Sequence, residues 1–517
     1  MARIRRTRRR SQSPAEAGGK DRLSALPDDL LRLILCHLDT RTALSTAVLA
    51  RRWAHLSREL PALEFTVFDV LPTRYLRTVN LRRRARARGV DVDKFDAVLT
   101  RCELRATRAF IDSINSLLKA DGSSDGDGHG GRNSRRRAKS LRLVFFPTDE
   151  AGCVDMMIAT AVGEWGVEDL EVAVCRTAPR DHPPPAYSFP DHLLDDERHR
   201  SRLRALLLGN CELPPLHRYG ALQELVLQYM AASTPMSSYD TVFNLCGLQV
   251  LHLICCRGTS DILVVSAPGS GLRELVVESC SFQTIELRAL PELGWFACLG
   301  STVELQFGAV PRLTHVNLRF SCSARDPAYD PPHHVLGFLL GDAPAAMTSL
   351  VVRFTGPRRW IVPRPLDNTL HGLRELLVAD VPSSWDVSWP RLLLEAAPAL
   401  EVLYIHVAPL EEHQKPGCDI QWQSSKFRHS KLRDLFMVGF TQAWRQIRFL
   451  RYLVKVCEPL EQVFLLRDWH IEDHGFWDWR VVKQREYSWS EVDQKVVERQ
   501  IKYGRSGSKP HVNVFLE

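Results

Sequence analysis

The sequence of 517 residues has no apolar run close to the ~18–20 residues that a membrane-spanning helix needs. Its basic start, MARIRRTRRRS, is not followed by the apolar segment of a secretion signal. It contains 13 cysteines, but neither a C-x-x-C pair nor an N-x-S/T glycosylation acceptor. Five of these cysteines stand in apolar runs, so we expect reduced thiols in a core, namely Cys246, Cys255, Cys256, Cys280 and Cys298. These features argue against a membrane or secreted protein and favour the nucleus or the cytosol.

Catalytic motifs are also missing. The chain has no P-loop, no dinucleotide-binding G-x-G-x-x-G, no H-E-x-x-H and no G-x-S-x-G. The acidic stretch at 125–130 faintly resembles a calcium loop, but Arg136 stands where the bidentate Glu would be needed. The sequence therefore predicts no enzyme, no cofactor and no metal site.

Positive charge is confined to three short runs. Residues 1–20 carry +6, and residues 82–88 and 132–139 carry +5 each. Since the whole chain carries only +7, the remainder is acidic, at about −9. This distribution argues against a nucleic-acid groove. A group of C-terminal aromatic residues could stack bases, but more often marks a packed edge or a partner surface: Trp469, Trp477, Trp479, Tyr487 and Trp489.

Residues 1–20 read as a solvated basic tail, with a nuclear-import signal and an organelle transit peptide as open alternatives. Residues 21–66 read instead as three short amphipathic helices. Pro27 and two aspartates favour a helix start, and we expect this helix to span about Asp28–Leu38. Its apolar stripe consists of Leu30, Leu31, Ile34, Leu35 and Leu38. Asp39 or Thr40 can cap the second helix, and Pro61 ends the third.

This segment resembles the F-box of plant proteins, over some 45 residues. The matching segments are Leu26–Leu31, Ile34–Leu35, Val48–Trp53 and Leu60–Phe65. Asp39 and Ser57 depart from the common pattern, in which a Pro and a Trp stand at these places. The resemblance implies a docking face for the Skp adaptor, formed by Leu26, Pro27, Leu30, Leu31, Ile34, Leu35, Leu38, Val48, Leu49, Trp53 and Leu56.

Residues 67–139 read as a linker. Apolar residues recur at helical spacing over Phe95–Leu118, which predicts a helix there. Residues 119–139 lack apolar side chains almost entirely, so we expect a disordered loop.

From residue 140 onward the chain repeats the phrase L-x-x-L-x-L or a close variant, and we assign residues 140–428 to the repeat region. Nine copies begin at Leu203, Leu222, Leu248, Leu272, Leu293, Leu313, Leu373, Leu400 and Leu432, and Leu350–Val352 is a candidate degenerate copy. The early spacings match the 20–29 residues of a leucine-rich repeat, in which a short strand lines the concave face of a horseshoe. The predicted fold class is therefore α/β, a three-helix F-box module followed by an irregular leucine-rich-repeat solenoid.

Residues 429–468 resemble the FBD segment that ends many plant F-box/leucine-rich-repeat proteins. The similarity rests on His429–Leu435, on Gly439–Phe440 and on Pro459–Glu461 around a helical run. The expected order is strand, helix, strand. Residues 469–517 form a C-terminal extension.

Together, the two resemblances imply the substrate receptor of an SCF-type cullin–RING ubiquitin ligase, which holds a target protein near the ubiquitin-charged enzyme without chemistry of its own. The alternative is a leucine-rich scaffold or sensor in which the helices only cap the solenoid. A cap should end flush with the repeats, whereas roughly 75 residues separate the helices from the first clear repeat. The sequence therefore favours a docking face that is left free for a partner protein.

Target contacts are expected on the concave face, because strand side chains alternate between the core and the surface. The predicted target-binding residues are Gln228, Gln249, His252, Glu278, Asn317, Arg374 and Tyr404. The alternative is a contact through the loops 323–334 or 411–426. Besides the adaptor, the expected partner is a target protein. We expect no binding to a membrane or to nucleic acid.

Overall fold

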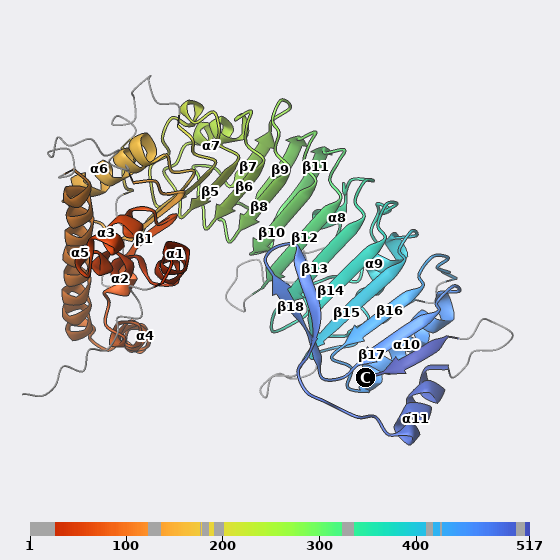
Figure 1. The fold of residues 1–517 in the computed structure, drawn as a ribbon. Coiled ribbons are helices and arrows are strands. Elements are labelled where there is room, and N and C mark those ends of the chain that lie inside the picture. The colour runs from red at the N-terminus through yellow and green to blue at the C-terminus, as the bar shows by residue number, and fades with distance from the viewer. Residues whose placement is uncertain are drawn as a thin grey trace, which may run out of the picture.

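The structure, a computed structural model, describes residues 26–122, 136–175, 177, 186–190, 201–322, 336–409, 417–423, 426–502 and 512–517. The predicted basic tail, the calcium-like stretch and most of the two alternative target loops lie outside these residues. Figure 1 shows one long curved sheet that connects N-terminal helices to the C-terminal strands. No helix in the described ranges combines the length and the apolar character that crossing a bilayer requires.

The curved sheet has fifteen strands, and every neighbouring pair is parallel. In spatial order they are β1 (Ala62–Thr66), β2 (Ser140–Phe145), β3 (Asp169–Val174), β4 (Ala205–Gly209), β5 (Glu224–Gln228), β6 (Val250–Ile254), β8 (Glu274–Glu278), β10 (Trp295–Gly300), β12 (His315–Ser321), β13 (Ser349–Thr355), β14 (Glu375–Pro382), β15 (Val402–Ala408), β16 (Asp434–Val438), β17 (Gln462–Leu466) and β20 (Asn513–Leu516).

The repeat phrase sets the position of these strands. Each of the nine copies begins two residues before a strand of the sheet, and the degenerate copy at Leu350–Val352 lies in β13. Leucines of the phrase stack in register between neighbouring strands, as Leu251 does with Leu275. Because each copy can bury its leucines only against the next copy, the array continues as one core. The predicted α/β solenoid is confirmed.

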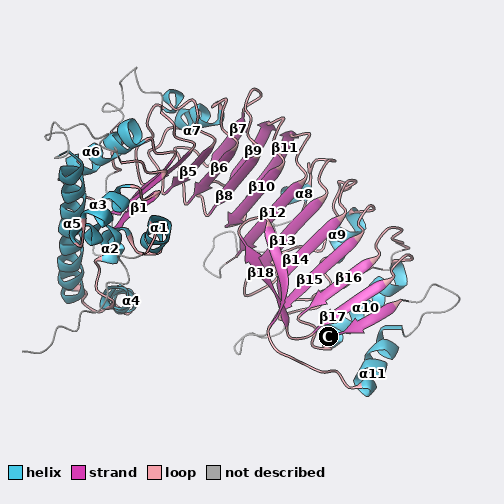
Figure 2. Cartoon of the chain, viewed as in Figure 1, coloured by secondary structure: helices cyan, strands magenta, loops and turns pink. Residues whose placement is uncertain are grey.

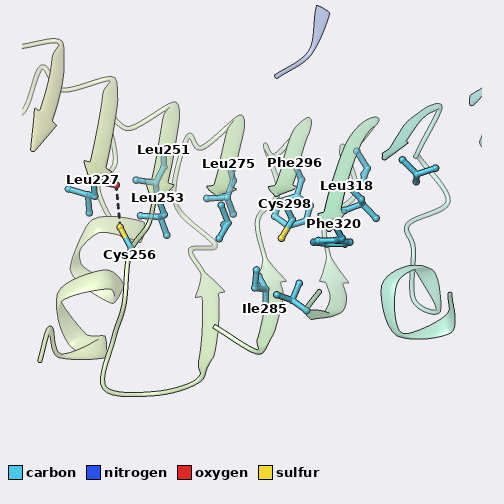
Figure 3. Packing of buried hydrophobic residues seen from close by; sticks show 14 of the residues in the cluster. Leu227, Leu251, Leu253, Cys256, Leu275, Ile285, Phe296, Cys298, Leu318 and Phe320 are labelled. Atoms are coloured by element: carbon cyan, nitrogen blue, oxygen red, sulfur yellow. Dashed lines mark hydrogen bonds between the residues drawn. The ribbon is translucent and has the colours of Figure 1, made fainter. Parts of the chain in front are cut away.

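Several cysteines close the repeat turns. The residue that follows β4, β5, β6 and β8 has a left-handed backbone, with φ between 52° and 57°, and turns the chain back toward the core. In three of these turns the next residue is a cysteine whose thiol donates to a carbonyl of the preceding repeat, as Cys256 does to Leu227 at 3.2 Å (Figure 3). Cys256 and Cys298 are buried as expected, but Cys246 is exposed, which corrects its assignment to the core.

The convex side carries a second layer (Figure 2). A three-stranded parallel sheet of β7 (Ile262–Ser266), β9 (Thr284–Ala289) and β11 (Glu304–Ala309) backs the middle of the arc. Helices take its place elsewhere: α6 (Gly152–Thr160), α7 (Met236–Phe243), α8 (Gly337–Leu340), α9 (Arg391–Ala396) and α10 (Trp444–Val456). The repeats are thus irregular on the convex side and regular on the concave side.

The N-terminal end contains the predicted F-box helices α1 (Asp28–Cys36), α2 (Thr40–Ser45) and α3 (Arg51–Arg58). Asp39 caps α2 by accepting a hydrogen bond from the Thr42 amide at 2.8 Å. Strand β1 follows and pairs directly with β2, 74 residues after the end of β1. Residues that are far apart in the sequence are therefore adjacent in the structure. This removes the reason for which we favoured a docking face over a cap.

The intervening residues cover this end of the sheet. Helix α4 (Arg74–Ala87) packs on α5 (Asp93–Gly122), which extends the predicted helix by a few residues at each end. The predicted loop 119–139 is wrong at both ends, because 119–122 are helical and Arg136 is buried. The Arg136 guanidinium donates to Asp121 at 2.9 Å and to the Ser57 carbonyl at 2.9 Å. It thereby joins α5, the F-box and the start of β2.

The C-terminal end begins with the expected strand, helix, strand, formed by β16, α10 and β17. The chain then makes a hairpin of β18 (Trp469–His474) and β19 (Asp478–Lys483), followed by α11 (Glu491–Lys502). It returns as β20, which pairs with β17 and completes the sheet. The described parts of this extension, residues 469–502 and 512–517, therefore pack on or pair with the solenoid.

Candidate functional site

The first candidate surface lies on the F-box. Arg52 at the start of α3 contacts Asp28 at 2.6 Å and donates to the Leu26 carbonyl at 2.6 Å. Arg32 of α1 contacts Glu59 at 2.7 Å. These ion pairs hold α1 against α3, with the starts of the two helices close together.

The structure divides the predicted adaptor residues into two groups. Four are buried in the core of the chain, with at most 6% exposure: Leu31, Leu35, Trp53 and Leu56. A side chain covered by its own chain cannot contact a second protein directly, so we correct the predicted docking face by removing these four. These four side chains support the docking face from the core of the chain. Leu26 and Ile34 are half-buried against the same core, and Pro27 is exposed.

The exposed group consists of large aliphatic side chains. Four of them are predicted adaptor residues, and the fifth, Leu33, is new: Leu30 (49% exposed), Leu33 (58%), Leu38 (37%), Val48 (90%) and Leu49 (72%). We call these five residues the F-box face. Leu49 lies just before α3 and Leu30 lies in the first turn of α1, so the contacts of Arg52 bring these two segments to the same end of the helices. Five such residues within 20 positions are more than scattered surface leucines require.

The second candidate surface is the concave side of the sheet. Register places one side chain of each strand in a continuous row, which we call the concave row. From β6 to β20 it consists of His252, Val276, Ala297, Asn317, Val351, Leu377, Tyr404, Phe436, Phe464 and Phe515. We expected a mixture of charges and amides on this face, but most of the row is apolar.

The hairpin of β18 and β19 covers the concave row (Figure 1). Phe476 and Trp477 pack on Val276 and Ala297. Further along the row, Trp479 lies edge-on to Tyr404, with ring centroids 4.8 Å apart. The tryptophans thus form a packed aromatic surface, which was one of the two readings of the sequence.

A carboxylate lies at the centre of this contact. Asp473 of the hairpin pairs with Arg319 of β12 and Arg353 of β13, and one Arg353 contact measures 2.9 Å. Arg353 also pairs with Asp380 at 2.7 Å, and His406 contacts Asp380 at 2.8 Å. Burial alone would raise the pKa of Asp473, but hydrogen bonds and charge from the two arginines hold it below its usual range.

The predicted target residues fall into three groups. His252, Asn317 and Tyr404 contact the hairpin, since Asn317 donates to the Phe476 carbonyl at 2.6 Å and His252 lies 5.2 Å from the Phe476 ring. This corrects their assignment to an open surface. Gln228 and Glu278 are half-buried at the ends of β5 and β8, with Ile254 of β6 between them. The last two, Gln249 and Arg374, precede their strands and lie at the rim.

Past the hairpin, the concave row continues as an aromatic ladder. Tyr404, Phe436, Phe464 and Phe515 stack in order, with centroids 4.5, 4.5 and 4.8 Å apart. Phe515, at the end of the ladder, is 42% exposed. The sequence could have revealed this row through the residue between the last two apolar positions of each phrase, which is aromatic in the copies at Leu400 and Leu432.

In the part of the chain that the structure describes, no cluster of three or more His, Cys, Asp or Glu side chains could hold a metal ion.

Comparison with known protein families agrees with the two modules. Residues 23–64 match the F-box domain model. Residues 132–472, about two thirds of the chain, match a leucine-rich-repeat model described as the At1g61320/AtMIF1 LRR domain.

Individual relatives come from Arabidopsis thaliana. An F-box/LRR-repeat protein, At3g03360, is 52% identical over 50 residues, which cover 10% of each chain. An F-box/FBD/LRR-repeat protein, At5g22670, is 50% identical over 50 residues, 10% of this chain and 11% of the relative. The F-box protein At5g03100 is 33% identical over 75 residues, 14% of this chain and 24% of the relative. The aligned segments thus span less than a quarter of each of these relatives.

Proposed function

Because this chain belongs to the plant F-box/leucine-rich-repeat proteins, we propose that it is a substrate receptor of an SCF-type ubiquitin ligase. An F-box domain in general implies binding of a Skp-like adaptor. In this proposal the F-box face docks on that adaptor, and the repeats hold a target protein. The receptor contributes proximity and no catalytic group, and it acts in the nucleus or the cytoplasm.

The exposed F-box face is the observation that carries this proposal. Its five aliphatic side chains lie on a module whose own core is already filled by Leu31, Leu35 and Trp53. A cavity of about 530 Å³ lies between α2, α3 and α5 and is partly lined by Leu44 and by Ala47, the residue before Val48. An exposed aliphatic group beside a partly apolar cavity is suited to a partner that brings its own apolar helix.

The scaffold alternative is supported by one observation, the direct pairing of β1 with β2. That pairing makes the F-box the N-terminal end of the solenoid, as a cap would be. A cap, however, has no use for large aliphatic side chains that neither the F-box core nor the repeats cover. Capping and docking are compatible, and the exposed face favours a receptor.

The test is adaptor binding by the full chain with the substitutions Val48→Glu and Leu49→Glu. Burying two introduced carboxylates at the interface should weaken binding to the purified Skp adaptor at least ~100-fold, while the melting temperature stays unchanged. Val492→Glu on α11 is the matched control, because Val492 is 70% exposed and lies far along the chain from the F-box. Unchanged adaptor affinity in the folded double variant would refute the receptor proposal.

A further inference from the structure

The hairpin of β18 and β19 is attached to the concave row in an unusual way. Its two strands pair with each other, and in the described residues neither pairs with a strand of the fifteen-stranded sheet. Among the described residues, the hydrogen bond recorded between the hairpin backbone and the row is the one that the Asn317 side-chain amide donates to the Phe476 carbonyl. Lifting the hairpin would therefore leave the hydrogen bonds of the solenoid sheet intact.

The fit of the hairpin on the row is also incomplete. Within the described part of the chain, Asn317 Oδ1, Arg319 Nε and Trp469 Nε1 are buried without a hydrogen-bond partner. Each buried unsatisfied polar group costs about 1–3 kcal/mol. The packing of the hairpin on the row is thus less favourable in free energy than the packing of the repeat core, whose leucines are almost completely buried.

The contacts of the hairpin identify the chemistry that the row accepts. Aromatic rings from Phe476, Trp477 and Trp479 lie on apolar positions, and the Asp473 carboxylate lies between them on two arginines. An arginine pair in a half-buried position binds a carboxylate through charge-assisted hydrogen bonds. The outward side of the hairpin, in contrast, is polar, with Glu472 opposite Arg480.

We propose that this hairpin is a displaceable internal ligand of the concave row, and that a target binds there by replacing it with a segment whose aromatic side chains flank a carboxylate. This inference rests on the proposed function, because it assigns the target site and its regulation. The chain then binds a target only when the gain exceeds the cost of lifting its own hairpin, which raises specificity.

The first test measures whether the hairpin lifts in the folded full chain. Val276→Cys places a thiol under Phe476 and Trp477, and Ala297→Cys does so at the neighbouring strand if the first variant folds poorly. Labelling by a thiol reagent is mapped by mass spectrometry, with Cys298 in the repeat core as the internal reference. The introduced thiol should react at least ~100-fold faster than Cys298, since it needs only local opening.

Asp473→Asn should speed this labelling at least ~10-fold by weakening the contact with Arg319 and Arg353. Glu472→Gln is the matched control, because Glu472 is on the outward side, and it should change nothing. Equal labelling of the introduced thiol and Cys298, in both the parent and the Asp473→Asn chain, would overturn the proposal and make the hairpin a permanent part of the fold.

The second test measures recognition. In a chain whose residues 469–483 are replaced by a Gly/Ser linker, a fluorescent peptide of residues 468–484 should bind, and the same peptide with Asp473→Asn should bind at least ~10-fold more weakly. Absence of binding, or equal binding of both peptides, would overturn the proposed recognition. Adaptor binding is measured on the same preparations, because its loss would count against the receptor function and not against the hairpin.

Discussion

The F-box and the concave face both carry apolar side chains beyond those that the repeat core contains, but the chain covers only one of them. On the F-box, Leu30, Val48 and Leu49 are bare. On the concave face, Val276, Ala297 and Leu377 are covered by a hairpin from the far end of the sequence.

This difference indicates two kinds of partner. A bare face is suited to a partner that is always available, since nothing has to move before binding. A covered face binds only a ligand that outcompetes the cover. A constant adaptor and a selected target fit this division.

The largest expected effect distinguishes support from contact within the F-box. Trp53→Ala empties a site that is 6% exposed and should lower the free energy of unfolding of α1–α3 by about 3–5 kcal/mol. Leu49→Ala removes a 72% exposed side chain and should change it by less than ~0.5 kcal/mol while weakening adaptor binding. Native-state hydrogen exchange of residues 28–58 measures the change in unfolding free energy in both variants. Equal losses of unfolding free energy in the two variants would show that the buried and the exposed F-box residues are not distinct groups.

A second pair of variants examines how firmly the F-box is joined to the repeats. Arg136→Ala leaves Asp121 without its ion-pair partner and the Ser57 carbonyl without its donor, so it should cost about 2–3 kcal/mol. Arg137→Ala changes the exposed neighbour and should cost less than ~0.5 kcal/mol. Chemical denaturation of the full chain reports the difference. If both variants unfold alike, the F-box is not held by this contact.

The smallest expected effect is the pH dependence of the hairpin. The pKa of Asp473 is lowered in the folded chain, so its contribution is complete above the pKa of the unfolded chain and is lost as the pH falls through the lower folded value. Below about pH 4, the protection of the hairpin amides, measured relative to intrinsic exchange at the same pH, should therefore fall by an amount worth about 1 kcal/mol. Asp473→Asn should remove this dependence. A dependence that persists in the variant would have to come from another carboxylate.

Local patterns in the sequence were sufficient for the helices of the F-box and for the nine strands of the repeat phrase. Helical spacing and strand alternation are set by neighbouring residues, so they can be read without the fold. The same spacing could not tell Leu31, which faces the core, from Leu30, which does not. That distinction depends on where α3 lies.

Contacts between distant residues could not be predicted. Strand β1 finds β2 only because α4 and α5 fold back between them. Asp473 lies 120 positions from Arg353 and 154 from Arg319, so no local pattern connects the carboxylate with its arginines. The concave face was predicted to carry a mixture of charges, amides and an aromatic, since local patterns do not reveal the hairpin that covers the row.

Hydrogen exchange of the full chain with and without the purified Skp adaptor tests the central claim most directly. The amides of residues 28–50 should become protected on adaptor binding, because the adaptor covers the F-box face. Those of the hairpin, residues 469–483, should be unchanged, because that surface is reserved for the target. Protection of the hairpin with none at residues 28–50 would contradict the division of the molecule into a bare docking face and a covered target face.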